Sequence, residues 1–276
     1  MDKDRGVSII VPTFNRPGLL RESLINLNKH TQYTPKEIIV VDGGSEPVEI
    51  SKYEQIKAEG LCDKMEFRPY FPFFEKRHRM DPGWSLEKMR NFSNSYLTGL
   101  DISNKNFPYV HFGADDLLYR TGWVEALIEM VESDWAKKYN VKLVSGFNHW
   151  CNPNDRVKMI QLVPETYKSK DGLVEGYASE WGGTYFLRKD EFEAMGRFKN
   201  NVSRPIPWYY EENCEVVLRE RFLERGWHWG TTVESYVQTM TQPSLLGNCR
   251  RDGNGNPLTD EHFCNGVAIG YAWKDI

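Results

Sequence analysis

Three short polar clusters, each at the end of an apolar run, could do chemistry in this chain. They are PTFN (residues 12–15), DGGS (42–45) and GADD (113–116). The adjacent carboxylates of Asp115 and Asp116 are of the kind that Mg²⁺ or Mn²⁺ prefers as ligands. Two other interpretations stay open, because both acids could cap a following helix or lie in a solvated turn. Asp42 could likewise hold an Asx turn.

The elements that must position these clusters alternate along the first 135 residues. Apolar runs predict strands over 7–12, 36–44, 65–70 and 107–113, and helical patterns cover 16–30, 46–59, 84–100 and 122–135. Continuous apolar strands joined by helices predict a parallel sheet covered on both faces. Ligands bind such sheets beyond the carboxyl ends of the strands, which is where all three clusters fall.

The second half of the chain reads differently. Strand-like runs cover 141–150, 157–163 and 183–189, and a clear helix is expected over 211–227. We expect one domain over residues 1–276. Its parts are residues 1–135, residues 136–235 and a C-terminal extension (236–276).

Composition narrows the class of protein. A net charge of -4 argues against general nucleic-acid binding, because no basic excess exists to displace phosphate counterions. The five cysteines show no disulfide framework, and no signal peptide or membrane span is visible. A cytoplasmic location is therefore expected.

Four motifs in order resemble a known family. VSIIVPTFNRPGLLRESLINL, EIIVVDGGS, SLEKMRNFSNSYLTG and YVHFGADD are similar to the family 2 glycosyltransferases of the GT-A fold, over roughly residues 6–135 with weaker agreement to about 230. The resemblance implies an α/β fold, a Rossmann-like, mostly parallel sheet flanked by helices. It also implies transfer of a sugar, with inversion, from a nucleotide-diphosphate donor to a hydroxyl of a glycan or other acceptor. On this basis residues 1–135 are expected to be the nucleotide-sugar-binding half and residues 136–235 the acceptor and catalytic half. A UDP-sugar is the first expectation for the donor.

The resemblance assigns roles to individual residues. Asp115 matches the acid of the Asp-x-Asp signature that coordinates Mn²⁺ or Mg²⁺, with Asp116 in support, while Gly113 stands where the signature has its first acid. The residues implied for nucleotide-sugar binding are Pro12, Thr13, Asn15, Asp42, Arg90, Ala114, Asp115, Trp181 and Gly183.

Inversion requires a base that deprotonates the acceptor hydroxyl. The family takes this base from a Glu-Asp pair that opens a helix, and alignment with EENCEVVLRERFLERGW puts Glu212 on the glutamate and Asn213 on the aspartate. Asparagine cannot serve as a base, so Glu212 is the expected base and Glu211 its reserve. Helix-start acids that only complement the helix dipole are the alternative.

Two rival functions are considered. A sugar nucleotidyltransferase would need a glycine-rich, basic loop after the first strand, and VPTFNRPG lacks that glycine density. A protein that binds a nucleotide-sugar or glycan without turnover is the other, because of Gly113 and Asn213.

Overall fold

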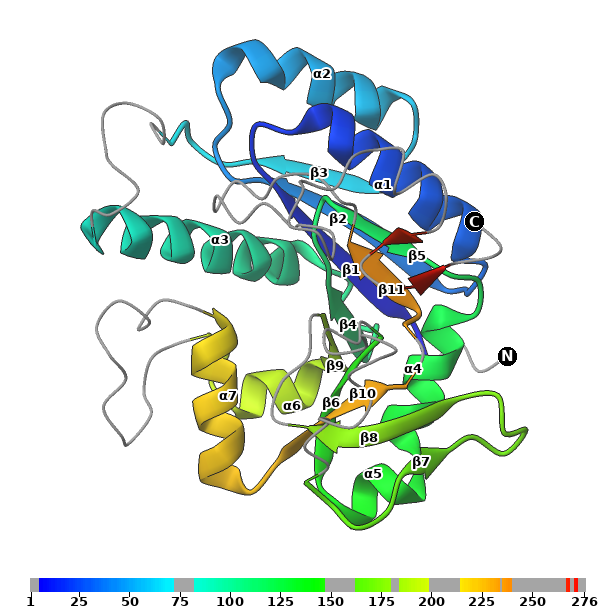
Figure 1. Ribbon diagram of the computed structural model, residues 1–276. Coiled ribbons are helices and arrows are strands. Elements are labelled where there is room, and N and C mark those ends of the chain that lie inside the picture. Colours follow the sequence, from blue (N-terminus) through cyan, green and yellow to red (C-terminus); the bar gives the residue numbers. More distant parts are fainter. Residues whose placement is uncertain are drawn as a thin grey trace.

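The computed structural model describes residues 5–71, 82–146, 162–179, 184–198, 214–233, 235–239, 267–268 and 271–272. A nine-stranded sheet with helices on both faces forms the centre of this part (Figure 1). Its strands, in spatial order, are β3 (Lys64–Phe67), β2 (Lys36–Asp42), β1 (Val7–Thr13), β4 (Tyr109–Phe112), β9 (Tyr185–Arg188), β6 (Val141–Ser145), β10 (His228–Thr232), β8 (Glu175–Ser179) and β7 (Tyr167–Lys168).

Seven of these nine strands run in one direction, and β8 and β9 run against them. β1 pairs in parallel with both β2 and β4, with Val7 opposite Lys36 on one side and Tyr109 on the other. β2 pairs in parallel with β3, and β6 with β10. β9 lies antiparallel between β4 and β6, and β8 is antiparallel to β10 and β7. The predicted mostly parallel sheet is confirmed, and the strand expected over 183–189 is the reversed β9.

Helices cover the sheet on two sides (Figure 1). They are α1 (Pro17–His30), α2 (Pro47–Ala58), α3 (Pro82–Ile102), α4 (Trp123–Glu132), α5 (Asp134–Lys138), α6 (Lys189–Ala194) and α7 (Cys214–Arg225). Successive strand side chains point to opposite faces. Ile9 of β1 therefore packs in one core with Leu20 and Leu24 of α1, and Ile10 packs in the other core with Leu100 of α3. Both faces of the sheet are thus buried, as its continuous apolar strands require.

The helix predicted over 122–135 is divided in two. α4 ends at Glu132, and the Ser133 side chain accepts a hydrogen bond from the Ala136 amide at 3.0 Å, which caps α5. A serine that caps a new helix interrupts the periodic pattern without any glycine or proline to announce it.

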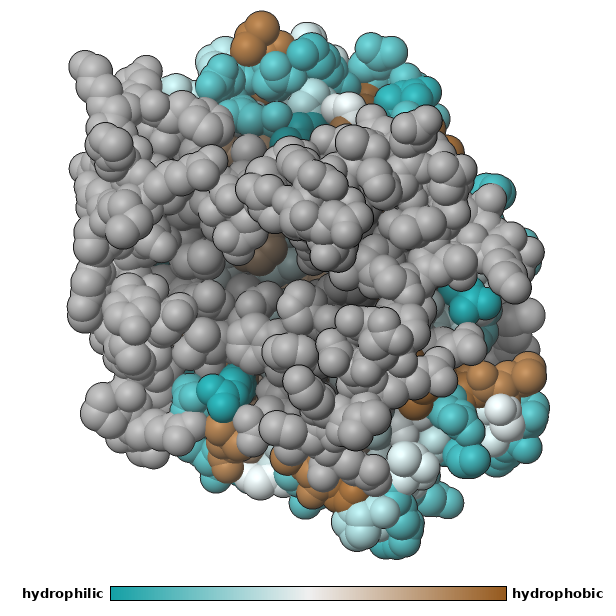
Figure 2. Space-filling view, in the orientation of Figure 1, coloured by the Kyte–Doolittle hydropathy of each residue, from teal (hydrophilic) through white to brown (hydrophobic). Residues whose placement is uncertain are grey.

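Among the residues of α2, only Tyr53 and Ile56 are buried. The surface at the top of the molecule, where α2 lies, is accordingly mainly hydrophilic in Figure 2. The buried Tyr53 is the exception that matters, since its hydroxyl reaches the candidate site described below.

Two small sheets complete the described chain, one of β5 (Leu117–Tyr119) with β11 (Val237–Thr239) and one of β12 (Val267–Ala268) with β13 (Tyr271–Ala272). The strand predicted over 157–163 lies outside the described residues except for 162 and 163, which are not in a strand. Among the helices of the described segments, none has the length and apolar character needed to cross a membrane.

Candidate functional site

The ends of β1 and β4 come together at the carboxyl edge of the sheet. The Thr13 hydroxyl, on the last residue of β1, donates a 2.8 Å hydrogen bond to Oδ2 of Asp115, three residues past β4. Both side chains are buried. Two of the three polar clusters identified in the sequence are therefore in direct contact, because parallel neighbours end at the same edge.

Arg16 supplies the positive charge that pairs with Asp115 and Asp116 at this edge. Its guanidinium is bound to both oxygens of Asp115, through Nη2 to Oδ1 and through Nε to Oδ2 at 3.3 Å, and its Nη1 lies 3.6 Å from Oδ2 of Asp116. Burial alone would lower the pKa of Arg16, but the Asp115 and Asp116 carboxylates outweigh it and raise that pKa. Burial raises the pKa of the Asp115 carboxyl, while Arg16 acts in the opposite direction. The pair is a hydrogen-bonded ion pair that is mostly shielded from solvent.

The two acids lie in the turn between β4 and β5, not at the start of a helix. α4 begins at Trp123 with Gly122 in the N-cap position, and β5 lies between the acids and that helix. The interpretation of Asp115 and Asp116 as helix caps is therefore wrong. The solvated turn is also excluded for Asp115, whose side chain is only 2% exposed.

Asp42 organises the loop that follows β2. Its Oδ2 accepts hydrogen bonds from the backbone amides of Gly44 at 3.2 Å and Ser45 at 2.9 Å, and the Ser45 hydroxyl donates to its Oδ1. Burial raises the pKa of the Asp42 carboxyl, although the Ser45 hydrogen bonds pull it down. The Asx-turn interpretation of Asp42 is thus confirmed, and its role toward a nucleoside base stays a prediction.

Glycine is required at position 44. Its φ is +90°, in the left-handed region, and a Cβ there would lie 2.1 Å from the Pro69 carbonyl oxygen. The Phe71 amide donates to the Gly44 carbonyl at 2.8 Å. The DGGS loop is therefore held against the chain that leaves β3, and a larger residue would separate the two.

Tyr53 joins the loops from beneath. Its hydroxyl lies 3.3 Å from the Thr13 hydroxyl, accepts a 3.0 Å hydrogen bond from the Arg16 amide and lies 3.4 Å from the Ser45 hydroxyl. Burial raises the pKa of Tyr53 to about 12, so the phenol is neutral at physiological pH. In the sequence, nothing marks this residue beyond an aromatic position in a polar helix.

Asn15 ties the first two loops to each other. It has a positive φ of 54°, a conformation that asparagine tolerates better than most residues. Its amide donates to the Ser45 hydroxyl at 2.7 Å, and its side-chain oxygen accepts from the Glu46 amide at 2.8 Å. These contacts make Asn15 a support of the loops, while its predicted contact with a nucleotide-sugar is untested.

The KMRN motif of α3 reaches the site through Asn91. The Asn91 side chain donates to the Gly43 carbonyl at 2.7 Å, whereas the preceding Arg90 has an exposed side chain. Arg68, just past β3, donates from Nη1 to the Asn91 carbonyl at 2.8 Å. Burial lowers the pKa of Arg68, and the attraction of Asp42 acts in the opposite direction. Arg68 was missed in the sequence because the strand expected over 65–70 placed it inside a strand, whereas β3 ends at Phe67.

The structure explains why position 113 is a glycine. A Cβ at Gly113 would lie 2.8 Å from the Tyr119 hydroxyl and 3.4 Å from Nε2 of His111. Those two groups lie 3.2 Å apart, and burial lowers the pKa of His111 to about 3, so the ring is neutral. The Tyr96 hydroxyl also donates to the Gly113 carbonyl at 2.6 Å. An acid at this position would meet a filled, largely aromatic environment.

The described residues offer a divalent cation only two carboxylates. No group of three or more His, Cys, Asp or Glu side chains suited to a metal occurs within the described segments. Asp115 and Asp116 provide the hard oxygen ligands that Mn²⁺ or Mg²⁺ prefers, and a nucleoside diphosphate would have to complete the coordination. Asp115 and Asp116 therefore fit a divalent cation whose remaining ligands come from a nucleoside diphosphate.

The remaining predicted residues are placed as follows. Pro12 is buried in β1 opposite Val41, and Ala114 is half-buried beside Asp115. Trp181, Gly183, Glu211 and Glu212 lie outside the described residues, as does Asn213.

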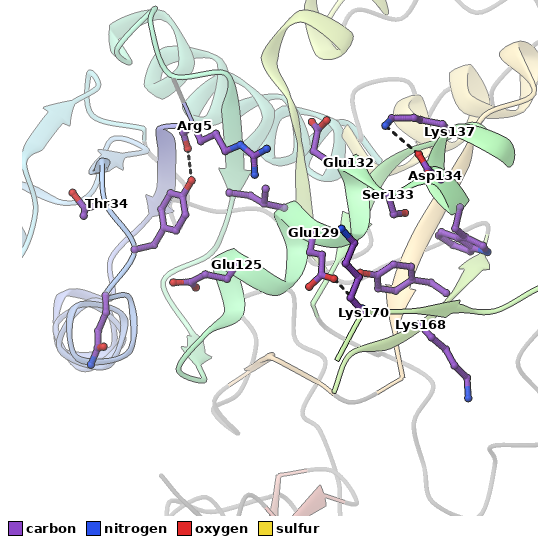
Figure 3. A pocket seen from close by; sticks show the side chains of 15 residues that line it. Arg5, Thr34, Glu125, Glu129, Glu132, Ser133, Asp134, Lys137, Lys168 and Lys170 are labelled. Atoms are coloured by element: carbon purple, nitrogen blue, oxygen red, sulfur yellow. Dashed lines mark hydrogen bonds and ion pairs between the residues drawn. The ribbon is translucent and has the colours of Figure 1, made fainter. Parts of the chain in front are cut away.

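A pocket of about 1160 Å³ lies at the opposite edge of the sheet (Figure 3). Arg5 and Thr34, which precede β1 and β2, line it together with the acids of α4 and α5. Most of its charges are already engaged, since Glu132 pairs with Arg188, Asp134 lies 3.5 Å from Lys137, and Glu129 accepts from a backbone amide. None of the predicted site residues lines this pocket.

Comparisons with known proteins agree with the fold. The chain is similar, over 83% of its length, to a mannosyltransferase from Pyrobaculum calidifontis solved with GDP-Man and Mn²⁺, at a TM-score of 0.51 and 14% identity. Over 89% of its length it is similar to residues 1–349 of TarS from S. aureus solved with UDP-GlcNAc, at a TM-score of 0.52 and 13% identity. The chain spans 56% and 61% of those two chains. No curated protein matches it.

A family model matches one segment of the chain. Residues 8–62 match the family model described as glycosyl transferase family 2, a segment that contains Thr13, Arg16, Asp42 and Tyr53. The predicted resemblance is confirmed over residues 8–62, which match the family 2 glycosyltransferase model, and the solved mannosyltransferase shows a similar fold over 83% of the chain.

Proposed function

We propose that the protein is a glycosyltransferase that moves a sugar, with inversion, from a nucleotide-diphosphate donor to a hydroxyl of a glycan or other acceptor. One observation carries the proposal. At the carboxyl edge of the sheet, Asp115 accepts hydrogen bonds from both Thr13 and Arg16, and Asn15 between those two residues contacts the DGGS loop. This edge is where α/β sheets bind their ligands.

The proposed division of labour follows from this arrangement. The DGGS loop, with Asp42 at its base, and Pro12, Thr13, Asn15, Arg90 and Ala114 would hold the nucleoside. Asp115 and Asp116 would hold Mn²⁺ or Mg²⁺, which offsets the charge of the departing diphosphate. Glu212, with Glu211 in reserve, would take the proton of the acceptor hydroxyl. Trp181 and Gly183 would lie on the sugar side.

The donor is best sought in a panel. A UDP-sugar is the first expectation, and the similar solved structures add GDP-Man and UDP-GlcNAc to the test. We expect release of nucleoside diphosphate with one donor when Mn²⁺ and an acceptor are present. Asp115→Asn should lower kcat/KM by about 100-fold or more, since second-shell changes at metal sites already cost about 10- to 100-fold.

Two results would revise this proposal. If a nucleoside diphosphate binds in thermal-shift measurements but no donor of the panel is consumed, the protein is a nucleotide-sugar-binding protein without turnover. If Glu212→Gln and Glu211→Gln both turn over at the wild-type rate, the base lies elsewhere while the rest of the proposal stands.

A further inference from the structure

We infer that Arg16 is the chain's own cation at the predicted metal site, so that a divalent cation can bind Asp115 and Asp116 only by displacing the Arg16 guanidinium. The inference deepens the proposed function and rests on it. It makes Arg16 a positioning residue that decides when the metal enters.

Arg16 occupies the side of the Asp115 carboxylate on which a metal ion would bind. Oδ2 accepts from Thr13 at 2.8 Å and from Nε of Arg16 at 3.3 Å, and Oδ1 accepts from Nη2 of Arg16. The guanidinium therefore lies across the outer edge of the carboxylate as a fork. A Mg²⁺ ion bound to the same oxygens would stand about 2.1 Å from them. That position overlaps the region that the guanidinium nitrogens occupy.

The positive charge of Arg16 would also repel a divalent cation at the two acids. Arg16 also faces Asp116, with Nη1 3.6 Å from its Oδ2, so one guanidinium serves both acids of the predicted metal site. Two positive ions at contact distance repel strongly where water is largely excluded. Only 21% of the Arg16 side chain is exposed, and only 2% of that of Asp115. A divalent cation and the present Arg16 position are thus mutually exclusive.

The backbone of Arg16 is anchored independently of its side chain. Its amide donates to the Tyr53 hydroxyl at 3.0 Å, and its carbonyl accepts from the Leu20 amide at 3.0 Å in the first turn of α1. The side chain can therefore move from the carboxylates without moving the loop. A diphosphate at this edge would supply oxygens both for the metal and for the displaced guanidinium, so metal and nucleotide should bind cooperatively.

The test is Mn²⁺ affinity in the absence of nucleotide, followed by electron paramagnetic resonance. We expect Arg16→Gln to bind Mn²⁺ at least about 10-fold more tightly than the wild type. Arg16→Lys, which keeps the charge but loses the fork, should lie between the two. Arg21→Gln is the matched control, because Arg21 is also on α1 but pairs with Glu59, and its Mn²⁺ affinity should equal that of the wild type.

A second readout guards against a variant that folds poorly. Mn²⁺ should raise the Tm of Arg16→Gln, and to a lesser extent of Arg16→Lys, by more than it raises the Tm of the wild type. Adding UDP or GDP should tighten Mn²⁺ binding more in the wild type than in Arg16→Gln. Equal or weaker Mn²⁺ affinity in both Arg16 variants would overturn the inference and leave the proposed function intact. If no variant binds Mn²⁺ even with nucleotide, the inference and the proposed metal site both fail.

Discussion

At the scale of single residues, the candidate site is a set of polar groups that satisfy one another. Thr13, Asn15 and Tyr53 each contact a neighbouring loop of the site, and Asp42 holds its own loop through Ser45. Such networks are costly to leave half-satisfied when buried. Conservative changes at buried members should therefore cost more than the same changes on the surface.

Gly113→Ala should destabilise the protein by about 1–3 kcal/mol, as expected when a methyl group is forced into a filled core. The new Cβ would lie 2.8 Å from the Tyr119 hydroxyl. Urea denaturation of the variant measures the change. Tyr119→Phe removes that hydroxyl, so the double variant should recover stability relative to the sum of the two single changes. Wild-type stability in Gly113→Ala would contradict this account of the glycine.

Tyr53→Phe should lower the free energy of unfolding by about 1–3 kcal/mol, because it leaves the Arg16 amide and the Thr13 hydroxyl with one partner fewer in a buried place. Tyr33→Phe is the matched control, since the Tyr33 hydroxyl donates to the Arg5 carbonyl near the surface. Its effect on urea denaturation should be within about 0.5 kcal/mol. Equal losses of stability in Tyr53→Phe and Tyr33→Phe would contradict the role of the Tyr53 hydroxyl in joining the loops.

At the scale of elements, a second polar cluster holds the amino ends of the strands. Glu37 of β2 accepts from the Ser8 hydroxyl at 2.6 Å, from Lys64 at 2.8 Å and from the Asn104 amide at 2.6 Å. Burial pushes the pKa of Glu37 upward, but the hydrogen bonds from Lys64 and Ser8 outweigh it, and the pKa lies below its ordinary value. The charged form is thus the one that stabilises the folded chain.

The stability lost in Glu37→Gln should depend on pH. A carboxyl whose pKa is lowered by folding contributes stability above its unfolded pKa of about 4.5 and loses it as pH falls through the folded value. The difference between wild type and Glu37→Gln should therefore be largest near pH 7 and shrink below about pH 4.5. Urea denaturation at several pH values tests this. Glu49→Gln, whose partner Lys52 is exposed, should show almost no difference at any pH.

The elements also show what sequence alone can and cannot predict. β1, β2 and α1 follow from the local sequence, because β1 and β2 are continuous apolar runs and α1 buries one apolar face. β5 is only three residues long, and the direction of β9 is set by pairing with β4 and β6, so neither leaves a local signal. Because ligands bind at the carboxyl ends of parallel strands, the sequence was enough to predict Thr13, Asp42 and Asp115 as site residues. The role of Arg16 depends on Asp115, which is 99 positions away in the sequence.

At the scale of the whole molecule, segments far apart in sequence share one sheet and one core. Lys189, at the start of α6, donates to the Ser8 hydroxyl of β1 at 2.8 Å, to the Ser103 hydroxyl at 2.9 Å and to the Asn104 carbonyl at 2.8 Å. Burial lowers the pKa of Lys189 to about 8. This side chain links residues 181 positions apart.

Lys189→Met should destabilise the protein by about 1–3 kcal/mol, because three acceptors lose their donor. The unfolded chain holds the proton of Lys189 up to about pH 10.4, whereas the folded chain releases it near pH 8. Stability from Lys189 therefore rises with pH between those values. The difference between wild type and Lys189→Met should be larger at pH 9.5 than at pH 7.5 in urea denaturation. Lys138→Met, at an exposed ion pair with Glu165, is the control and should show no such trend.

The position of β9 fixes the order in which this molecule can be completed during synthesis. β4 is made by residue 112, but its neighbour β9 ends only at residue 188, and β6 on the far side of β9 is made in between. A ribosome adding about 5–20 residues per second delivers β9 several seconds after β4. Throughout that interval the edge of β4 and the apolar Val110 and Phe112 lack their final cover. An unpaired strand edge beside uncovered apolar side chains is open to aggregation during that interval, which is when chaperones can act on the nascent chain.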